Sequence, residues 1–184
     1  ITHIQSLKNL DLGDSKITDV KAKNIAQLKG LSQLDLANNE IETPGVKSLT
    51  EIKGLVSLDL TLNNIDDSAA GALGAFKRLE YLKLSFNNIT DEGLSFLSNL
   101  LQLNTLVLSD SKITGDGFTH ISKAKQLAYL DLSSNEIKGG GFFAHLQELR
   151  HLTTLDVGHN SIDYTGATEI SKLANLTTLN IEHN

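Results

Sequence analysis

Apolar residues recur along this 184-residue chain with a fixed period of 24 positions. The stretch from Leu79 to Ile89 shows the repeating unit, whose skeleton reads Leu-x-x-Leu-x-Leu-x-x-Asn-x-Ile. The skeleton starts again at Leu7, Leu31, Leu55, Leu103 and Leu127 and, after one step of 25 residues, at Leu152 and Leu176. A period of this length is typical of a solenoid, in which each unit packs against its two neighbours.

The Leu-x-Leu part of each unit alternates apolar and outward-facing positions, which predicts a short strand. In the fourth unit Leu82 and Leu84 are expected on the buried face, because successive side chains of a strand point to opposite sides. Tyr81, Lys83 and Ser85 are then expected on the other face. The asparagine of the skeleton follows, where the chain has to turn.

A second apolar set, spaced by three residues, follows each predicted strand. In the fourth unit it is Leu94, Leu97 and Leu100, preceded by the segment Thr90-Asp91-Glu92-Gly93. That segment offers an N-cap residue and acidic first-turn residues, so the pattern predicts a helix. Strands that alternate with helices have to run parallel, with the helices as return connections.

The skeleton resembles that of the leucine-rich-repeat superfamily, and the resemblance covers the whole chain. It implies an α/β right-handed solenoid, a horseshoe arc with a parallel β-sheet on the concave face and helices on the convex face. In that family an asparagine ladder binds backbone groups of the turns through its side-chain amides. The matching asparagines are Asn39, Asn63, Asn87, Asn135 and Asn160. Ser15 and Ser111 depart from the pattern, and a hydroxyl is expected to do part of the same task.

Small residues recur just before the first apolar residue of the predicted helices, at Gly45, Gly93, Gly117 and Gly166. They are expected to let the helices pack closely. The motif resembles the GALA-type 24-residue repeats of bacterial effector proteins delivered into host cells, and the segment 166–170 is the nearest copy. In such effectors the repeats select the substrate for host ubiquitin-ligase machinery, which another segment recruits. Lys21 and Ala69 break the motif at equivalent positions.

The repeat predicts one continuous solenoid over residues 1–184, with about seven full repeats and partial repeats at both ends. Residues 1–6 look like the end of a preceding repeat, so we expect the capping units to lie outside this sequence. The single 25-residue step is placed in the segment 138–142, which contains three glycines. This insertion is a hinge or contact loop on one interpretation and a neutral surface insertion on the other.

The chain contains no cysteine, which excludes disulfides, thiolate nucleophiles and cysteine-based zinc sites. This composition favours a bacterial or host-cytosolic setting over a eukaryotic extracellular one. The sequons at Asn88 and Asn175 are interpreted as chance matches in an asparagine-rich repeat. No stretch of 18 apolar residues predicts a membrane span.

The sequence shows no phosphate-binding loop, zinc-protease motif or nucleophile elbow, so it predicts neither an enzyme active site nor a cofactor. His159 and His183 occupy equivalent positions in adjacent repeats and could share a metal with Asp156 or Glu182. The alternative, two exposed polar residues, is favoured because a metal site needs further ligands. No metal is therefore expected.

Outward-facing positions of the predicted sheet carry the candidate binding site. Apolar and aromatic residues without a core role group there in the middle repeats, together with one lysine: Leu62, Tyr81, Lys83, Phe86, Val107 and Tyr129. An exposed apolar group inside a polar rim marks an interaction site, and tyrosine is a favoured anchor. The acidic residues assigned to the rim are Asp35, Asp59, Asp131 and Asp156.

Acidic residues dominate that face, where eight carboxylates against Lys83 give a charge of −7 in a chain of net charge −6. Such a field would steer a partner with a basic or apolar-basic surface. Like charges on adjacent strands are destabilising, so the aspartate column is not expected to serve stability. The column is either a functional feature or a habit of the superfamily, in which Leu-Asp-Leu is common, and both interpretations stay open. Nucleic acid is not expected as a partner, because phosphate binding needs a basic track and this face has the opposite sign. The lysines of the helices are interpreted as interleaved with Asp and Glu on a solvated surface.

We therefore expect a non-catalytic module that binds a protein on its concave face, as the recognition domain of a bacterial effector acting on a host protein. Small-molecule substrates and membranes are not expected as partners. The alternatives are a substrate-recruiting part of a ubiquitin-ligase-type assembly and a part of a larger enzyme whose catalytic domain lies outside this chain. Stacking of copies through apolar ends is a further, structural alternative.

Overall fold

Short strands and helices alternate throughout the computed structural model, which describes residues 4–184. Residues 1–3 of the expected preceding repeat lie outside the described part. Eight three-residue strands form one parallel sheet in chain order: β1 (Asn9–Asp11), β2 (Gln33–Asp35), β3 (Ser57–Asp59), β4 (Tyr81–Lys83), β5 (Thr105–Val107), β6 (Tyr129–Asp131), β8 (Thr154–Asp156) and β10 (Thr178–Asn180). Equivalent repeat positions pair directly, as Leu82 does with Leu106. The α/β solenoid and its parallel sheet are thus confirmed.

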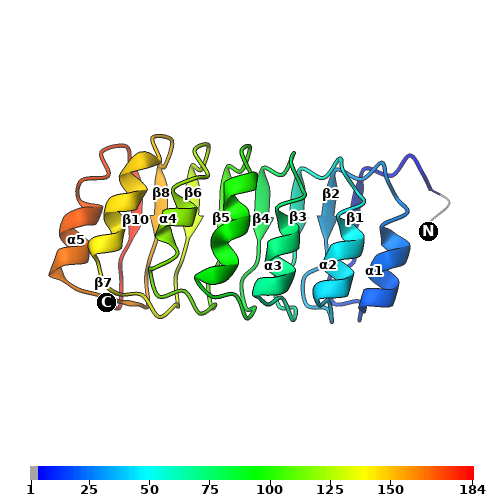
Figure 1. Cartoon of the computed structure of the whole chain (residues 1–184), viewed down its shortest axis with the longest axis horizontal. Coiled ribbons are helices and arrows are strands. Elements are labelled where there is room, and N and C mark those ends of the chain that lie inside the picture. Colours follow the sequence, from blue (N-terminus) through cyan, green and yellow to red (C-terminus); the bar gives the residue numbers. More distant parts are fainter. Residues whose placement is uncertain (1–3) are drawn as a thin grey trace.

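A row of helical segments covers the other side of the sheet (Figure 1). The α-helices are α1 (Asp19–Ile25), α2 (Thr43–Leu49), α3 (Asp67–Leu73), α4 (Phe118–Ile121) and α5 (Tyr164–Ile170). Two further segments, η1 (Glu92–Asn99) and η2 (Gly141–Glu148), are 3₁₀ helices. Leu94, Leu97 and Leu100 have the same spacing of three as the apolar sets of the α-helical repeats, so the fourth predicted helix is in the right place but of the tighter 3₁₀ kind.

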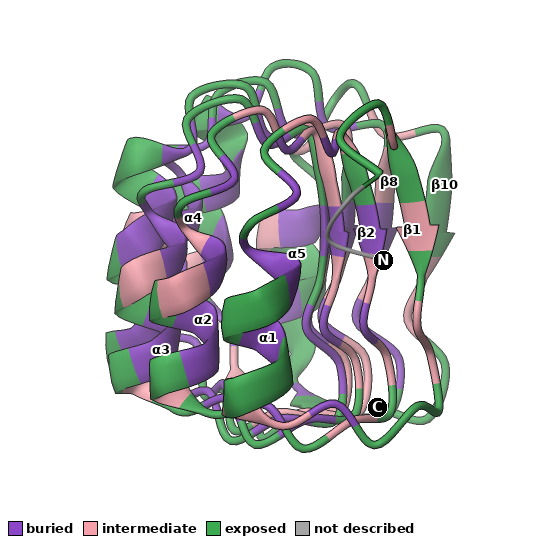
Figure 2. Cartoon of the chain, turned by 90° about the vertical axis from the view of Figure 1, so that its right-hand side faces the viewer, coloured by how far each residue is buried: buried purple, intermediate pink, exposed green. Residues whose placement is uncertain are grey.

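The core lies between the two layers, as the end-on view shows (Figure 2). The leucines of the skeleton fill it, and Leu82 and Leu84 have no exposed surface. Both leucines were expected on the buried face, so that prediction is confirmed. Burial of each leucine side chain stabilises the fold by roughly 2 kcal/mol, because its apolar surface leaves water.

The asparagines bridge adjacent repeats as expected. Asn87 Nδ2 donates to the carbonyl oxygens of Leu60 and Leu84 at 2.9 Å, and its Oδ1 accepts from Ile65 N at 2.9 Å. Because Leu60 and Ile65 belong to the preceding repeat, one amide satisfies backbone groups of two units. This links sequence positions 22 and 27 residues apart.

The serines that replace asparagine differ from each other. Ser15 Oγ donates to Gly13 O at 3.0 Å and so does part of the asparagine's task. Ser111 Oγ is buried and has no hydrogen-bond partner within residues 4–184. The expectation that a hydroxyl would help at Ser111 is therefore wrong, because the short side chain does not reach the carbonyls that the longer amide reaches.

Three of the four glycines before the helices make room for a carboxylate of the preceding repeat, whereas Gly166 faces the backbone of Gly139 and Gly140. Asp19 Oδ1 accepts from the N–H groups of Glu42 and Gly45, both at 2.9 Å, and a Cβ on Gly45 would lie 2.4 Å from that oxygen. The aspartate–glycine pairs are Asp19 with Gly45, Asp67 with Gly93, and Asp91 with Gly117. Where the preceding repeat has Thr43 instead, Ala69 is tolerated. The motif thus reflects capping by the neighbouring repeat as well as close packing.

Thr90, the expected N-cap of the fourth unit, accepts a hydrogen bond from Glu92 N of η1 through its Oγ1 at 3.3 Å. Asp91, expected in the first turn, stands directly before η1 and makes no cap hydrogen bond to it. Its Oδ1 instead accepts from Gly117 N in the next repeat at 2.8 Å. This carboxylate thus contacts the backbone of the following repeat rather than its own helix.

The glycine-rich insertion is packed rather than loose. Lys138–Gly139 forms β7, which pairs with β9 (Ser161–Ile162) in a small second sheet. Gly140 is buried, and a Cβ on it would lie 1.9 Å from the Cα of Gly166. The two backbones can approach this closely only without side chains, so neither a hinge nor a neutral surface insertion describes this contact.

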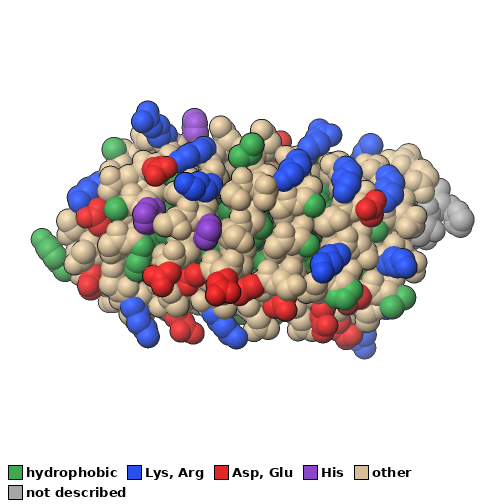
Figure 3. Space-filling view, in the orientation of Figure 1, with side chains coloured by type: hydrophobic (Ala, Val, Ile, Leu, Met, Phe, Trp, Pro, Cys, Tyr) green, Lys and Arg blue, Asp and Glu red, His purple; other side chains and the backbone are tan. Residues whose placement is uncertain are grey.

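Charges on the helical face are separated between its two borders (Figure 3). Most Lys and Arg side chains lie in the upper half of that view, and most Asp and Glu side chains lie along the lower border. The interpretation that lysines and acids are interleaved on this face is therefore wrong. Repeats place equivalent residues side by side, so a preference at one repeat position becomes a stripe along the solenoid.

Candidate binding surface on the concave sheet

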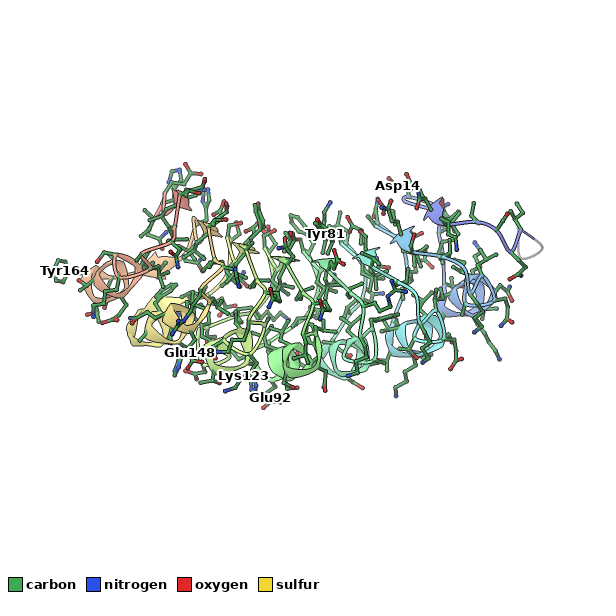
Figure 4. The ribbon with its side chains drawn as sticks, turned by 90° about the horizontal axis from the view of Figure 1, so that it is seen from above. Asp14, Tyr81, Glu92, Lys123, Glu148 and Tyr164 are labelled. Atoms are coloured by element: carbon green, nitrogen blue, oxygen red, sulfur yellow. The ribbon has the colours of Figure 1, made fainter. Side chains whose placement is uncertain are left out.

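The outward side chains of the sheet line the inner side of a shallow arc, and Tyr81 lies on that side (Figure 4). Four of the predicted anchors are well exposed although they are large and apolar: Leu62 (45%), Tyr81 (47%), Phe86 (49%) and Tyr129 (38%). Val107 lies between Lys83 and Asp131 in the register of the sheet and is partly exposed. The structure thus brings the predicted central residues onto neighbouring strands and turns of one face.

Leu62 and Phe86 hold an unusual backbone conformation. Their φ angles are 54° and 55°, in the left-handed region, at the residue that precedes the ladder asparagine. The equivalent residues of the other repeats share this conformation and are polar: Asp14, Asn38, Asp110, Ser134, His159 and His183. Asn, Asp and Gly tolerate this region best, whereas a bulky apolar residue there is an outlier. The two apolar exceptions are adjacent and both face the candidate site.

The aspartates of the rim have a structural task that the sequence did not reveal. Asp35 Oδ1 accepts from Ala37 N at 2.9 Å, and Asp59 Oδ1 accepts from Thr61 N at 2.9 Å. Asp131 and Asp156 bind the N–H two residues onward in the same way. The argument that this column is not there for stability is therefore wrong, because each carboxylate caps its own turn. The second carboxylate oxygens of Asp59 and Asp156 are also engaged, by Lys83 Nζ at 3.2 Å and Asn180 Nδ2 at 3.0 Å, which leaves those of Asp35 and Asp131 to face a partner.

Lys83 and Val107 interrupt this aspartate column in two adjacent strands, β4 and β5. Neither side chain can accept a hydrogen bond from the backbone, so these two repeats lack the cap that an aspartate would give. Lys83 Nζ instead forms an ion pair with Asp59 Oδ2 at 3.2 Å. The predicted apolar centre therefore coincides with the part of the sheet where the repeat departs from its stabilising residues.

A shallow hollow of about 410 Å³ lies over β1 to β5. Asp35, Asp59, Tyr81 and Lys83 contribute to its lining, whereas Phe86, Tyr129 and the aspartates of β6 and β8 lie outside it. The candidate surface thus has two parts, a hollow lined by carboxylates and exposed apolar side chains outside it, which are Leu62 and Phe86 in the turns after β3 and β4 and Tyr129 in β6. The sequence columns predicted the residues but not this division.

The Tyr129 hydroxyl and the Asp110 carboxyl have pKa values that are shifted from their ordinary values. Burial, together with the carboxylates of Asp131 and Asp156, raises the pKa of the Tyr129 hydroxyl. Burial and the neighbouring Asp131 raise the pKa of Asp110, while His159 acts in the opposite direction. The carboxylates on this side of the sheet therefore influence the ionisation of both Tyr129 and Asp110.

The histidine pair forms a stack at the C-terminal end of the same surface. The His159 and His183 rings lie 4.5 Å apart with an angle of 23° between their planes, and His159 Nε2 is 3.7 Å from Glu182 Oε1. Across residues 4–184, no group of three His, Cys, Asp or Glu residues is arranged to hold a metal ion.

In this part of the chain, no helix is long and apolar enough to cross a membrane.

Comparison with models of known protein families identifies the family of this chain. A family model described as leucine-rich repeat matches residues 5–65 and 77–137, and a second one of the same description matches residues 148–171. The chain belongs to the leucine-rich repeat family. These models describe leucine-rich repeats in general, so the GALA-type subfamily stays a proposal. A comparison with curated proteins gives no match.

Solved structures of leucine-rich repeat proteins share the fold. An internalin (inlF) from Listeria monocytogenes superposes with a TM-score of 0.83 at 30% identity, over 98% of this chain and 49% of that one. An internalin C2 from the same organism gives a TM-score of 0.75 at 22% identity, over 98% and 83% of the two chains. The plant peptide hormone receptor RGFR1, solved in complex with RGF2, gives 0.65 at 20%, over 98% and 33%. The chain spans about half the length of the internalin F structure.

Proposed function

We propose that this chain is a non-catalytic protein-binding module whose central site lies on the concave sheet. Leucine-rich repeats are typically binding modules, and the receptor RGFR1 is an example solved with its peptide hormone. The site consists of the exposed apolar side chains of Leu62, Phe86 and Tyr129 and of the hollow that Tyr81 and Asp35 help to line. A partner segment with apolar and basic side chains complements both parts.

The observation that carries this proposal is the clustering of unfavourable choices. Bulky residues occupy the left-handed conformation at Leu62 and Phe86, and the capping aspartate is lost at Lys83 and Val107. Each of these residues costs on the order of 1 kcal/mol in backbone strain or in a lost cap, and at Phe86 the partial burial of the ring offsets this cost. All four fall in three adjacent repeats and face the same surface, which is the distribution expected where binding, rather than the local backbone, determines the residue.

Selection from a random peptide library tests the site and the chemistry of its partner. We expect the enriched peptides to combine an aromatic or aliphatic residue with Arg or Lys, and to lose binding to a Phe86→Asn variant. The matched control is Tyr164→Ala, since Tyr164 is 87% exposed but lies on α5, away from the sheet. Peptides that bind both variants equally well would place the site elsewhere.

We further propose that the module recognises a host protein for a bacterial effector. The GALA-like motif and the similarity to a Listeria internalin support this setting. The alternative roles, substrate recruitment for a ubiquitin-ligase-type assembly or for a catalytic domain elsewhere in a longer protein, use the same surface. Co-purification from host cells that express the longest available form would distinguish these roles. Substrate recruitment predicts that ligase subunits co-purify together with the partner protein, and that the Phe86→Asn variant loses the partner protein.

A further inference from the structure

A second charged surface lies along the border where the helices end and the strands begin, here called the helix-exit edge. It comprises the segments from the last turn of each helix to the residue before the next strand, together with residues 4–8. These segments hold eleven of the sixteen Lys and Arg residues but only four of the 22 acids, a net charge of +7. The rest of the chain therefore carries −13. The edge is the one strongly basic surface of the described residues, and Figure 3 shows this separation.

Helix dipoles account for only part of this charge. Lys23 and Lys47 lie in the last turns of α1 and α2, where a cation interacts favourably with the dipole. Lys29, Lys53 and Lys125 lie four residues beyond the last helical residue of their repeats, where that effect has faded. The excess of cations is thus not explained by helix stability.

Leu101 interrupts the basic column at its middle. The column consists of equivalent residues from successive repeats, Lys29, Lys53, Lys77, Leu101, Lys125 and Arg150. Leu101 is 62% exposed although it stands beside cations on both neighbouring repeats. Leu101 therefore places one exposed apolar side chain within an otherwise cationic column.

A hollow of about 520 Å³ opens on the same edge, between the two repeats that follow the repeat of Leu101. Lys125, Arg150 and His151 line it together with Glu148, which forms an ion pair with Lys125. Figure 4 places Lys123 and Glu148 on the helical side of the molecule, away from Tyr81. The edge therefore offers an apolar anchor, flanking cations and a concave continuation, separate from the concave sheet.

We propose that the helix-exit edge is a second docking surface, which binds an acidic protein segment that carries an apolar side chain. Charge complementarity selects the acidic partner, and Leu101 selects the apolar residue. A single-stranded nucleic acid fits less well, because the exposed aromatic residues of the described part, Tyr81, Phe86, Tyr129 and Tyr164, all lie elsewhere. The proposal is independent of the function assigned to the concave sheet.

Fluorescence anisotropy with defined probes tests this proposal at low salt. The probes are a labelled 12-residue Asp/Glu peptide with a central Leu, the same peptide with a central Ser, and a 12-nucleotide single-stranded DNA. We expect the Leu peptide to bind most tightly, and Leu101→Ser to weaken that peptide about fivefold without affecting the Ser peptide. The double variant R78E/K123E should weaken both peptides about tenfold or more, since both cations flank the repeat of Leu101.

The control variant K112E/K138E makes the same charge change at exposed lysines of the opposite border and should alter affinity less than about twofold. Circular dichroism would establish that each variant is folded. Equal losses in both double variants, or no peptide binding at all, would overturn the proposal. Tighter binding of the DNA would replace the acidic protein by a nucleic acid. A loss with Phe86→Asn as large as with R78E/K123E would move the peptide to the concave sheet.

Discussion

Phe86 offers the sharpest test of whether the left-handed turn at the candidate site is strained. Its φ of 55° lies in the left-handed region, where an L side chain other than Asn or Asp costs roughly 1–2 kcal/mol. Three substitutions, Phe86→Ala, Phe86→Gly and Phe86→Asn, remove the ring. They differ in how well the new residue tolerates the backbone conformation, so their comparison separates the ring from the strain.

The loss of the ring is similar in the three variants. About half of the Phe86 side chain is exposed, so roughly 100 Å² of apolar surface leaves water on folding. At about 25 cal/mol per Å² this burial contributes at most about 2.5 kcal/mol, which exceeds the strain. Every variant should therefore be less stable than the natural chain. Gly and Asn should nevertheless be about 1 kcal/mol more stable than Ala, because they tolerate the left-handed conformation.

Urea unfolding followed by circular dichroism measures this order, and anisotropy with a peptide selected by the natural chain measures binding. Binding should weaken by about 2 kcal/mol, near thirtyfold, in all three variants, because each lacks the anchor. Equal stabilities of the Ala and Gly variants would refute the strain argument. Unchanged affinity in the three variants would refute the role of Phe86 while leaving the strain argument intact.

Three further predictions concern contacts between repeats. Ser111→Asn should raise the unfolding free energy by about 1 kcal/mol, measured in urea, because the amide would reach carbonyls that the hydroxyl leaves unbonded; an unchanged midpoint would contradict this. Asp110→Asn should stabilise the fold at neutral pH. The pKa of Asp110 is raised on folding, so the unfolding free energy falls as pH rises from the unfolded pKa through the folded pKa, and Asn removes this loss. The gain should vanish below about pH 4 in thermal melts. Gly93→Ala should destabilise by more than 1 kcal/mol, and Asp67→Thr should offset part of that loss, so additive effects of the two changes would argue against the 2.4 Å clash.

The spacing of leucines was sufficient to predict the sheet, the helical layer and the buried positions. Leu84 could be assigned to the core because one period of 24 residues fixes the register of every strand. The exposed positions of Tyr81 and Phe86 followed from the same alternation. Local patterns and a repeat therefore determine this fold to a degree that is unusual for a globular core, since every contact has a constant separation in sequence.

Features that depend on contacts between repeats were not predicted. The carboxylate of Asp91 caps a backbone 26 residues onward, and no local signal reports such a distance. The structural task of the strand aspartates was not predicted. Asp accepts hydrogen bonds from the N–H two residues onward in turns of many kinds, so the residue type alone did not indicate this task. The left-handed turn did have a signal, since its column is rich in Asn, Asp, Ser and His, and Leu62 and Phe86 are exceptions within it.

Mapping of a bound peptide by NMR tests the central claim most directly. The 19.9 kDa chain is small enough for backbone amide spectra, and a library-selected peptide can be titrated into it. The account predicts that amide shifts concentrate at Tyr81, Lys83, Phe86 and Val107, with little change in α1 or α5. Shift changes confined to the helical layer, with these four residues unaffected, would contradict it.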